Sequence, residues 1–448
     1  MTAPKVTAEL ADWIVGFDPS AIPAEVRREG VRTFVNWVGC AVGGARHETA
    51  DRALAAVSPF SGPRNATVLG RSERLDALYA ALLNGITSHV LDYDDTHLET
   101  IIHPAGPVAS ALLALSEIRP LSGRDLLTAM VIGVEVECRI GNAIYPDHYE
   151  RGWHITGTAG VFGSAAAVGR AIGLDAQKMR WALGLAATQS SGLREMFGTM
   201  TKSFHPGRAA QNGMLAAFLA EAGFDSSERG IEAPSGFANV MSDKQDYSEI
   251  LEGLGIRWEA ALNSYKPFAC GIVIHPTIDG CLQIREEIGE RVRDIEAVAL
   301  TTHPLVLELT GKTAPKTGLE GKFSVYHAAA CALLRGDGAP TAFTDEVVNL
   351  PEIIALRDKV TAKADPDCHA ASATIEVTFK DKPKLTKHVE RAIGSREKPL
   401  TDEQLDTKFV NQAKLVIGEA QTRDLLALAW RIDELDEAAV VARASVPH

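Results

Sequence analysis

Apolar residues recur at helical spacing through the first two-thirds of the chain, and this pattern constrains the fold more than any other feature. In residues 22–42, for example, Val31, Phe34, Val35 and Val38 fall on one helical face. The same spacing runs through residues 75–91, 107–118, 122–144, 157–172 and 177–188. Helices with one apolar face bury it against their neighbours, so the sequence predicts a large helical domain.

The pattern changes after about Lys266. Residues 294–302 and 373–379 alternate in polarity and carry β-branched side chains, as strands do. Helical spacing returns at Thr401. The sequence therefore predicts a mainly α protein, in which a large all-helical domain formed by residues 1–266 and 397–448 is interrupted by a smaller α+β domain, residues 267–396.

Charge and hydropathy exclude several classes of function. The net charge is −13 with no Lys/Arg block, which argues against binding to nucleic acid or to an anionic membrane surface. No apolar run reaches the roughly 18 residues of a membrane span, and no signal peptide is recognised, so a cytoplasmic protein is expected. The six cysteines are scattered, which predicts buried free thiols and no zinc cluster or disulfide framework.

Four His-Pro pairs are a first source of candidate catalytic groups: His103, His205, His275 and His303 each precede a proline. Proline suits the first turn of a helix, and the second and third pairs lead into apolar-periodic runs. We therefore expect His205 and His275 at helix N-termini, where the helix dipole favours a neutral imidazole that can act as a base or donor. For any one pair, a capping or core histidine is the alternative.

A dense polar segment precedes the first of these pairs. Its members fall within twelve residues: Asp92, Asp94, Asp95, Thr96, His97, Glu99 and His103. Clustered carboxylates also suit hard metal ions, but the spacing matches neither an EF-hand nor H-E-x-x-H. We interpret the segment as an acid–base cluster, with a solvated acidic loop as the alternative.

Further candidate groups lie in three short motifs. GWHITGT contains His154, TKSFHPGR contains Lys202 and Arg208, and SYKPFACGIVIH places Lys266 at the expected domain boundary. Ligand clefts favour such boundaries. Lys202 and Lys266 lie in apolar turns punctuated by proline, whereas Lys322 is expected to be a solvated surface residue.

Taken together, LDYDDTH with HPAG, GWHITGT, TKSFHPGRAAQNG and YKPFACGIVIHP resemble, in order and over most of the chain, the MmgE/PrpD family. This family includes 2-methylcitrate dehydratase, cis-aconitate decarboxylase and iminodisuccinate epimerase. The resemblance implies a helical domain, a smaller α+β lid domain, a cleft between them, a homodimer, and no metal or nucleotide cofactor. It also implies site residues at these positions: Asp92, Thr96, His103, His154, Lys202 and Lys266.

Two departures bear on the reaction. His327 stands where the decarboxylase branch has a tyrosine, with Tyr326 one residue earlier, and an extra residue separates Thr96 from His103. Both argue against decarboxylation, and we add His275, Tyr326 and His327 to the candidate substrate contacts.

The shared chemistry is removal of a proton from the carbon beside a carboxylate of a small polycarboxylic acid. Lys266, Lys202 and Arg208 would bind carboxylates and stabilise the carbanion, and His103 and His154 would transfer protons. Asp92 and Thr96 would orient His103. Epimerisation of an iminodisuccinate-type substrate is the favoured outcome, and a 2-methylcitrate-type dehydratase is the alternative. A non-catalytic carboxylate-binding protein is disfavoured, because binding alone needs cations and not two placed histidines.

Overall fold

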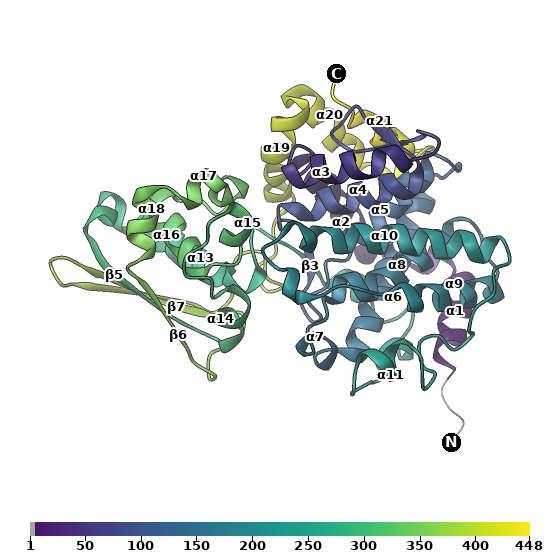
Figure 1. The fold of residues 1–448 in the computed structure, drawn as a ribbon, viewed down its shortest axis with the longest axis horizontal. Coiled ribbons are helices and arrows are strands. Elements are labelled where there is room, and N and C mark those ends of the chain that lie inside the picture. Colours follow the sequence, from purple (N-terminus) through teal and green to yellow (C-terminus); the bar gives the residue numbers. More distant parts are fainter. Residues whose placement is uncertain (1–4) are drawn as a thin grey trace.

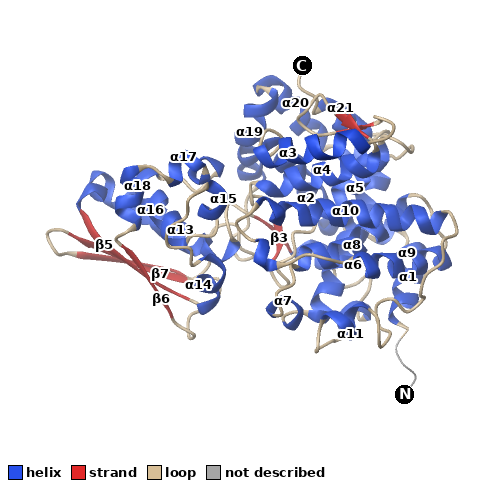
Figure 2. Ribbon diagram, viewed as in Figure 1, coloured by secondary structure: helices blue, strands red, loops and turns tan. Residues whose placement is uncertain are grey.

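The computed structural model describes residues 5–448, and it confirms a mainly helical protein with a small mixed sheet in its C-terminal region (Figures 1 and 2). The helices of the larger part are α1 Val6–Gly16, α2 Ala24–Gly43, α3 Glu48–Val57, α4 Ala77–Val90, α5 Ala105–Ser116, α6 Gly123–Ile144, α7 Asp147–Glu150, α8 Ile155–Ala171, α9 Ala176–Gln189, α10 Met200–Glu221, α11 Phe237–Met241 and α12 Ser248–Leu251. The chain returns to this part with α19 Asp402–Ile417, α20 Glu419–Trp430 and α21 Ala439–Ala444.

The smaller part is a four-stranded sheet with helices packed against it. Its strands are β5 Ile295–Thr302, β6 Val360–Ala364, β7 Ala373–Phe379 and β8 Lys384–Val389, in the order β6-β5-β7-β8, with only the β5–β6 pair parallel. Its helices are α13 His275–Ile288, α14 Pro304–Thr310, α15 Gly318–Gly321, α16 Val325–Arg335, α17 Asp345–Val348 and α18 Pro351–Arg357. Alternate residues of β7 are buried, as the polarity pattern predicts.

Each part has its own apolar core. The larger core contains side chains from Val6 to Tyr265 and again from Leu400 to Ala442, and the smaller core contains side chains from Phe268 to Phe379 together with Tyr93. We therefore propose the division expected from the sequence, with residues 1–266 and 397–448 in one domain and residues 267–396 in the other.

Two short elements and one helix crossing position the residues between the domains. A two-stranded sheet joins β3, Asp95–His97, to β4, Asn263–Tyr265. A separate two-stranded sheet, formed by β1, Ala66–Thr67, and β2, Arg74–Leu75, belongs to the helical part alone. At the crossing of α4 and α10, a Cβ on Gly85 would lie 2.4 Å from the Cα of Gly207. Only glycines allow this approach, which brings the end of α4 beside the start of α10.

Two expectations about histidines and lysines are wrong. His205 lies inside α10 and not at its N-terminus, because the helix begins at Met200 and continues through Pro206; His275 does begin α13. Lys322 is 3% exposed and donates to the carbonyl oxygens of Leu91 at 2.6 Å and Ala269 at 2.9 Å. It is thus a buried contact between the domains.

Two further expectations concern membrane-spanning helices and the state of the cysteines. In the described part of the chain, no helix combines the length and apolar character needed to cross a membrane. The cysteines there are free thiols, and all are buried except Cys368, which is partly exposed.

Candidate active site

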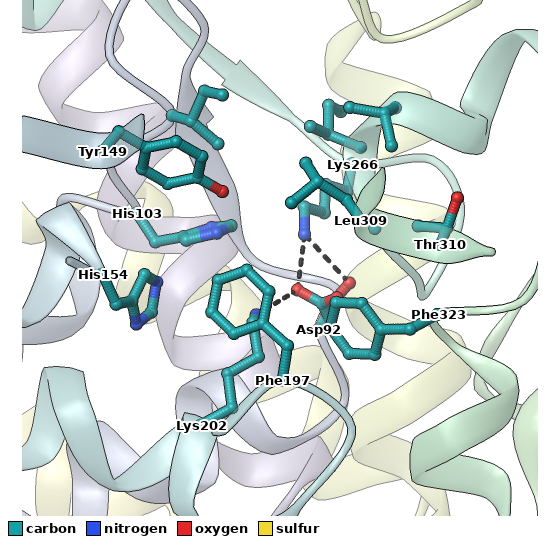
Figure 3. A pocket seen from close by; sticks show the side chains of 14 residues that line it. Asp92, His103, Tyr149, His154, Phe197, Lys202, Lys266, Leu309, Thr310 and Phe323 are labelled. Atoms are coloured by element: carbon teal, nitrogen blue, oxygen red, sulfur yellow. Dashed lines mark hydrogen bonds and ion pairs between the residues drawn. The ribbon is translucent and has the colours of Figure 1, made fainter. Parts of the chain in front are cut away.

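A small pocket lies between the two domains, and both domains contribute to it (Figure 3). The helical domain contributes Asp92, Ile101, His103, Tyr149, His154, Phe197, Lys202 and Lys266. The smaller domain contributes Gly271, Ile272, Val273, Leu309, Thr310 and Phe323. The cavity measures about 30 Å³, room for only one or two water molecules, so a larger ligand can enter only if the surrounding side chains or domains move.

Two lysines meet on one carboxylate oxygen in this pocket. Lys266 Nζ lies 2.5 Å and Lys202 Nζ 2.9 Å from Oδ1 of Asp92, and all three side chains are buried (Figure 3). Asp92 has φ +49°, an unusual backbone conformation for a non-glycine residue. Lys266 directly follows β4, and its N–H donates to the carbonyl of Asp94 at 3.2 Å, so strand pairing fixes its position.

His89, at the end of α4, connects Lys202 to a second carboxylate. Lys202 Nζ donates to His89 Nε2 at 2.9 Å, and His89 Nδ1 lies 2.6 Å from Asp94 Oδ2. An ionised carboxylate only accepts hydrogen bonds, so Nδ1 of His89 carries the proton and Nε2 accepts from the lysine. The chain of contacts is therefore complete with His89 neutral.

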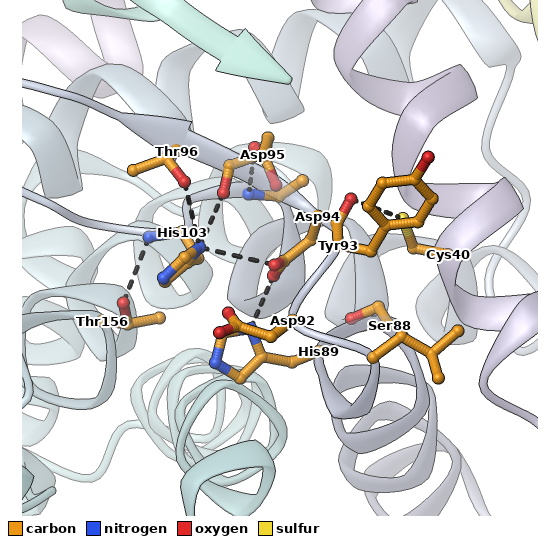
Figure 4. Close-up of polar contacts among 12 residues, drawn as sticks. Cys40, Ser88, His89, Asp92, Tyr93, Asp94, Asp95, Thr96, His103 and Thr156 are labelled. Carbon is orange, nitrogen blue, oxygen red and sulfur yellow. Dashed lines mark hydrogen bonds and ion pairs between the residues drawn. The ribbon is translucent and has the colours of Figure 1, made fainter. Parts of the chain in front are cut away.

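His103 has its tautomer fixed by the backbone (Figure 4). Its Nδ1 lies 2.7 Å from the carbonyl oxygen of Asp95, 3.3 Å from Oγ1 of Thr96 and 3.4 Å from Oδ1 of Asp94. A carbonyl can only accept, so Nδ1 holds the proton and the neutral ring presents a bare Nε2. Its backbone N–H donates to Thr156 Oγ1 at 3.1 Å, which further fixes the residue.

His154 immediately precedes α8, and it lies beside His103 on one side of the pocket (Figure 3). The ring centroids of His103 and His154 are 6.3 Å apart, and the ring of Phe197 packs edge-on against His154 at 5.0 Å. The ring of His154 also stacks on that of His89, with centroids 6.0 Å apart, and its Nδ1 lies 2.7 Å from Nδ1 of His205.

Burial and neighbouring charges set the ionisation of these groups. Burial would raise the pKa of Asp92, but the ammonium groups of Lys202 and Lys266 outweigh this effect and lower the pKa well below its usual value. Burial, aided by nearby cations, lowers the pKa of His103 and of His154 well below 6.5. Both histidines are therefore neutral at pH 7 and can accept a proton.

Some candidate residues from the sequence lie outside the pocket. Arg208 is exposed and bonds to Gln211 on the wall of another cavity. His275 is buried against Phe268, and His327 bonds through Nε2 to the carbonyl of Ala342. Tyr326 packs against the core of the smaller domain.

Thr96 does not line the pocket, and its Oγ1 lies 3.3 Å from Nδ1 of His103. Asp92, in contrast, bonds to the lysines, and the carboxylate nearest His103 is that of Asp94.

His89 is the principal residue that the motifs did not single out. It lies at the end of α4, three residues before Asp92 and directly beside the LDYDDTH motif, and this was the available signal. The aromatic rings of Tyr149, Phe197 and Phe323 were also missed, because single aromatic residues in a sequence are indistinguishable from core residues.

A metal ion would find ligands here only by displacing existing contacts. One ring nitrogen each of His89, His103 and His154 lies within 4.8 Å of the others, as do donor atoms of His89, Asp92 and Asp94. His89, common to both groups, already bonds through its two nitrogens to Lys202 and Asp94. An adjacent ammonium also repels a cation, so the residues favour an anion over a metal.

Comparison with known proteins identifies the family. The MmgE/PrpD N-terminal domain matches residues 8–250 and the MmgE/PrpD C-terminal domain matches residues 268–434. The chain therefore belongs to the MmgE/PrpD family.

The relatives of this chain are named for two different enzyme activities. Cis-aconitate decarboxylase of Aspergillus terreus is 27% identical, covering 96% of this chain and 94% of that protein, and cis-aconitate decarboxylase of Homo sapiens is 27% identical, covering 98% and 94%. 2-Methylcitrate dehydratase of Cupriavidus necator is 21% identical, covering 81% and 78%.

Proposed function

We propose that this protein is a metal-independent lyase that forms a carbanion beside a carboxylate of a small polycarboxylic acid, with decarboxylation of a cis-aconitate-type substrate as its reaction. The observation that carries this proposal is the pairing of two buried ammonium groups with two neutral histidines in one small pocket. Cations stabilise the negative charge that develops on the carboxylate, and a histidine transfers the proton.

Asp92 keeps both lysines in place before substrate arrives. Its Oδ1 binds both ammonium groups, while Oδ2 is buried without a hydrogen-bond partner. A substrate carboxylate entering beside Lys202 and Lys266 would share these donors, and the extra charge of the carbanion would strengthen the contacts. Binding that strengthens in the transition state raises turnover and not affinity alone.

The placement of the histidines favours a lyase over an epimerase. Two groups that invert a carbon work from opposite faces. His103 and His154 both belong to the helical domain and lie on the same side of the pocket (Figure 3).

The relatives support the same choice. Proteins named cis-aconitate decarboxylase match nearly the whole chain at 27% identity, whereas those named 2-methylcitrate dehydratase match at 21–23%. His327, which argued against decarboxylation, points away from the pocket toward Ala342. Dehydration of a 2-methylcitrate-type acid is the alternative lyase reaction.

Epimerisation of an iminodisuccinate-type substrate is the second candidate, favoured by the presence of two neutral histidines in one pocket. We also propose a homodimer, as the family resemblance implies, and sedimentation equilibrium would test it.

Incubation of the protein with cis-aconitate, 2-methylcitrate and iminodisuccinate in deuterated water separates the candidates by NMR. Decarboxylation releases CO₂ and leaves one deuterium in the product, dehydration gives a new alkene, and epimerisation introduces deuterium with inversion. If calorimetry detects binding but no acid reacts, the protein is a carboxylate binder and the proposal is wrong.

A further inference from the structure

A second cavity, of about 520 Å³, lies on the other side of His154 from the catalytic pocket. Its polar lining residues are Gln189, Ser191, Thr201, His205, Arg208 and Asn212. We call it the outer cavity. His154 lines the catalytic pocket and His205 lines the outer cavity, so this pair of rings forms the wall between them.

The two rings meet through like atoms. Nδ1 of His154 lies 2.7 Å from Nδ1 of His205, and the ring centroids are 5.0 Å apart. A hydrogen bond holds one proton, so one ring donates through Nδ1 and the other accepts. If His154 donates, its Nε2 is bare and acts as a base. If His205 donates, Nε2 of His154 carries a proton and acts as an acid.

We propose that His205 relays protons between His154 and the outer cavity and so sets whether His154 is an acid or a base. This inference rests on the proposed function. In the protonating direction, His154 gives the proton on Nε2 to the carbanion and takes the Nδ1 proton of His205. His205 in turn takes a proton from water or buffer at Nε2, so one solvent proton enters and the pair remains neutral.

The rest of the site supports this assignment. The carbonyl of Asp95 fixes His103 as a base, which leaves His154 as the histidine whose tautomer can change. Burial, with His89 and Lys202 nearby, lowers the pKa of His205 to about 4, which favours a concerted exchange that creates no imidazolium. The other charged group on the outer cavity is Arg208, on the same helix.

Decarboxylation uses this exchange, because replacing a carboxylate by hydrogen consumes one proton per turnover. A neutral His154 can give up its Nε2 proton without becoming an anion only if it receives a proton at Nδ1, the atom in contact with His205. After the product leaves, Nε2 of His154 takes a proton from water in the opened pocket, its Nδ1 proton returns to His205, and His205 releases one at Nε2. This restores the starting tautomers and leaves a net uptake of one proton per turnover.

The test compares His205→Asn with Thr201→Ala, a substitution on the same cavity wall. Asparagine keeps a polar group near the position of Nδ1 but cannot relay a proton. In weak buffer we expect His205→Asn to lower kcat about 10²-fold, with KM unchanged, and imidazole to restore turnover in a saturable way. Thr201→Ala should resemble the wild type and gain nothing from imidazole.

Two results would overturn the relay: undiminished turnover of His205→Asn in weak buffer, or a folded variant that imidazole does not rescue. Failure of the proposed function looks different, because the wild type would then decarboxylate no acid. In that case ¹⁵N NMR of histidine-labelled protein still decides. The relay requires ring nitrogen shifts of His154 averaged between two tautomers, and a single fixed tautomer contradicts it.

Discussion

Substitution of Lys266 by methionine tests the central electrostatic argument. Methionine keeps much of the apolar stem and removes the ammonium group 2.5 Å from Asp92. If that group stabilises the carbanion, turnover should fall about 10²–10³-fold, or roughly 2.7–4 kcal/mol of transition-state stabilisation. Because Lys266 is 1% exposed, the change also breaks a buried ion pair, which typically costs about 3–5 kcal/mol of folding stability.

We expect the lower end of that range, about 3 kcal/mol, because Lys202 remains 2.9 Å from the same oxygen of Asp92. The matched control is Lys266→Arg, which keeps a cation beside Asp92. It should recover most of the free energy of unfolding, measured by urea denaturation, and part of the turnover. Near-normal turnover of Lys266→Met, whatever its stability, would refute the carbanion role.

Three further predictions concern metal, pH and the domain contact. Prolonged chelation should leave turnover unchanged, and activity restored by one specific divalent ion would contradict the acid–base assignment. Because burial lowers the pKa of His103 well below 6.5, kcat/KM should stay level from pH 7 to below pH 6, whereas loss of activity near pH 6.5 would indicate a solvated histidine. Burial lowers the pKa of Lys322 to about 8, so its cation is lost as pH rises through 8. KM for an anionic substrate should then rise in the wild type but stay flat in Lys322→Met.

The mainly helical fold and the identity of the pocket lysines could be predicted because local patterns carry them. Alternation in residues 373–379 specifies a strand with one buried face, which β7 has. In the sequence, Lys202 and Lys266 have apolar neighbours, which is unusual for a solvated lysine. In the structure both are buried and form ion pairs with Asp92.

Other parts of the site depend on long-range packing and carry little local signal. Arg208 follows Lys202 by six residues along α10, and this spacing directs it to the outer cavity and not to the pocket. Pro206 predicts a helix start at His205, but α10 packs against α4 and α8 and continues through the proline. Lys322 is buried because it bonds two carbonyls across a domain contact that no local pattern contains.

The unusual backbone of Asp92 fits the same mechanism. Before substrate binds, the two buried ammonium groups need a counter-charge, since an isolated buried cation tends to lose its proton. Asp92 supplies it with one oxygen, at φ +49°, while its other oxygen has no hydrogen-bond partner. We propose that it acts as an internal stand-in for a substrate carboxylate. A substrate carboxylate must compete with Asp92 for the two lysines, which weakens binding of the ground state. The carbanion carries more negative charge and binds the lysines more strongly. This difference in binding free energy lowers the barrier.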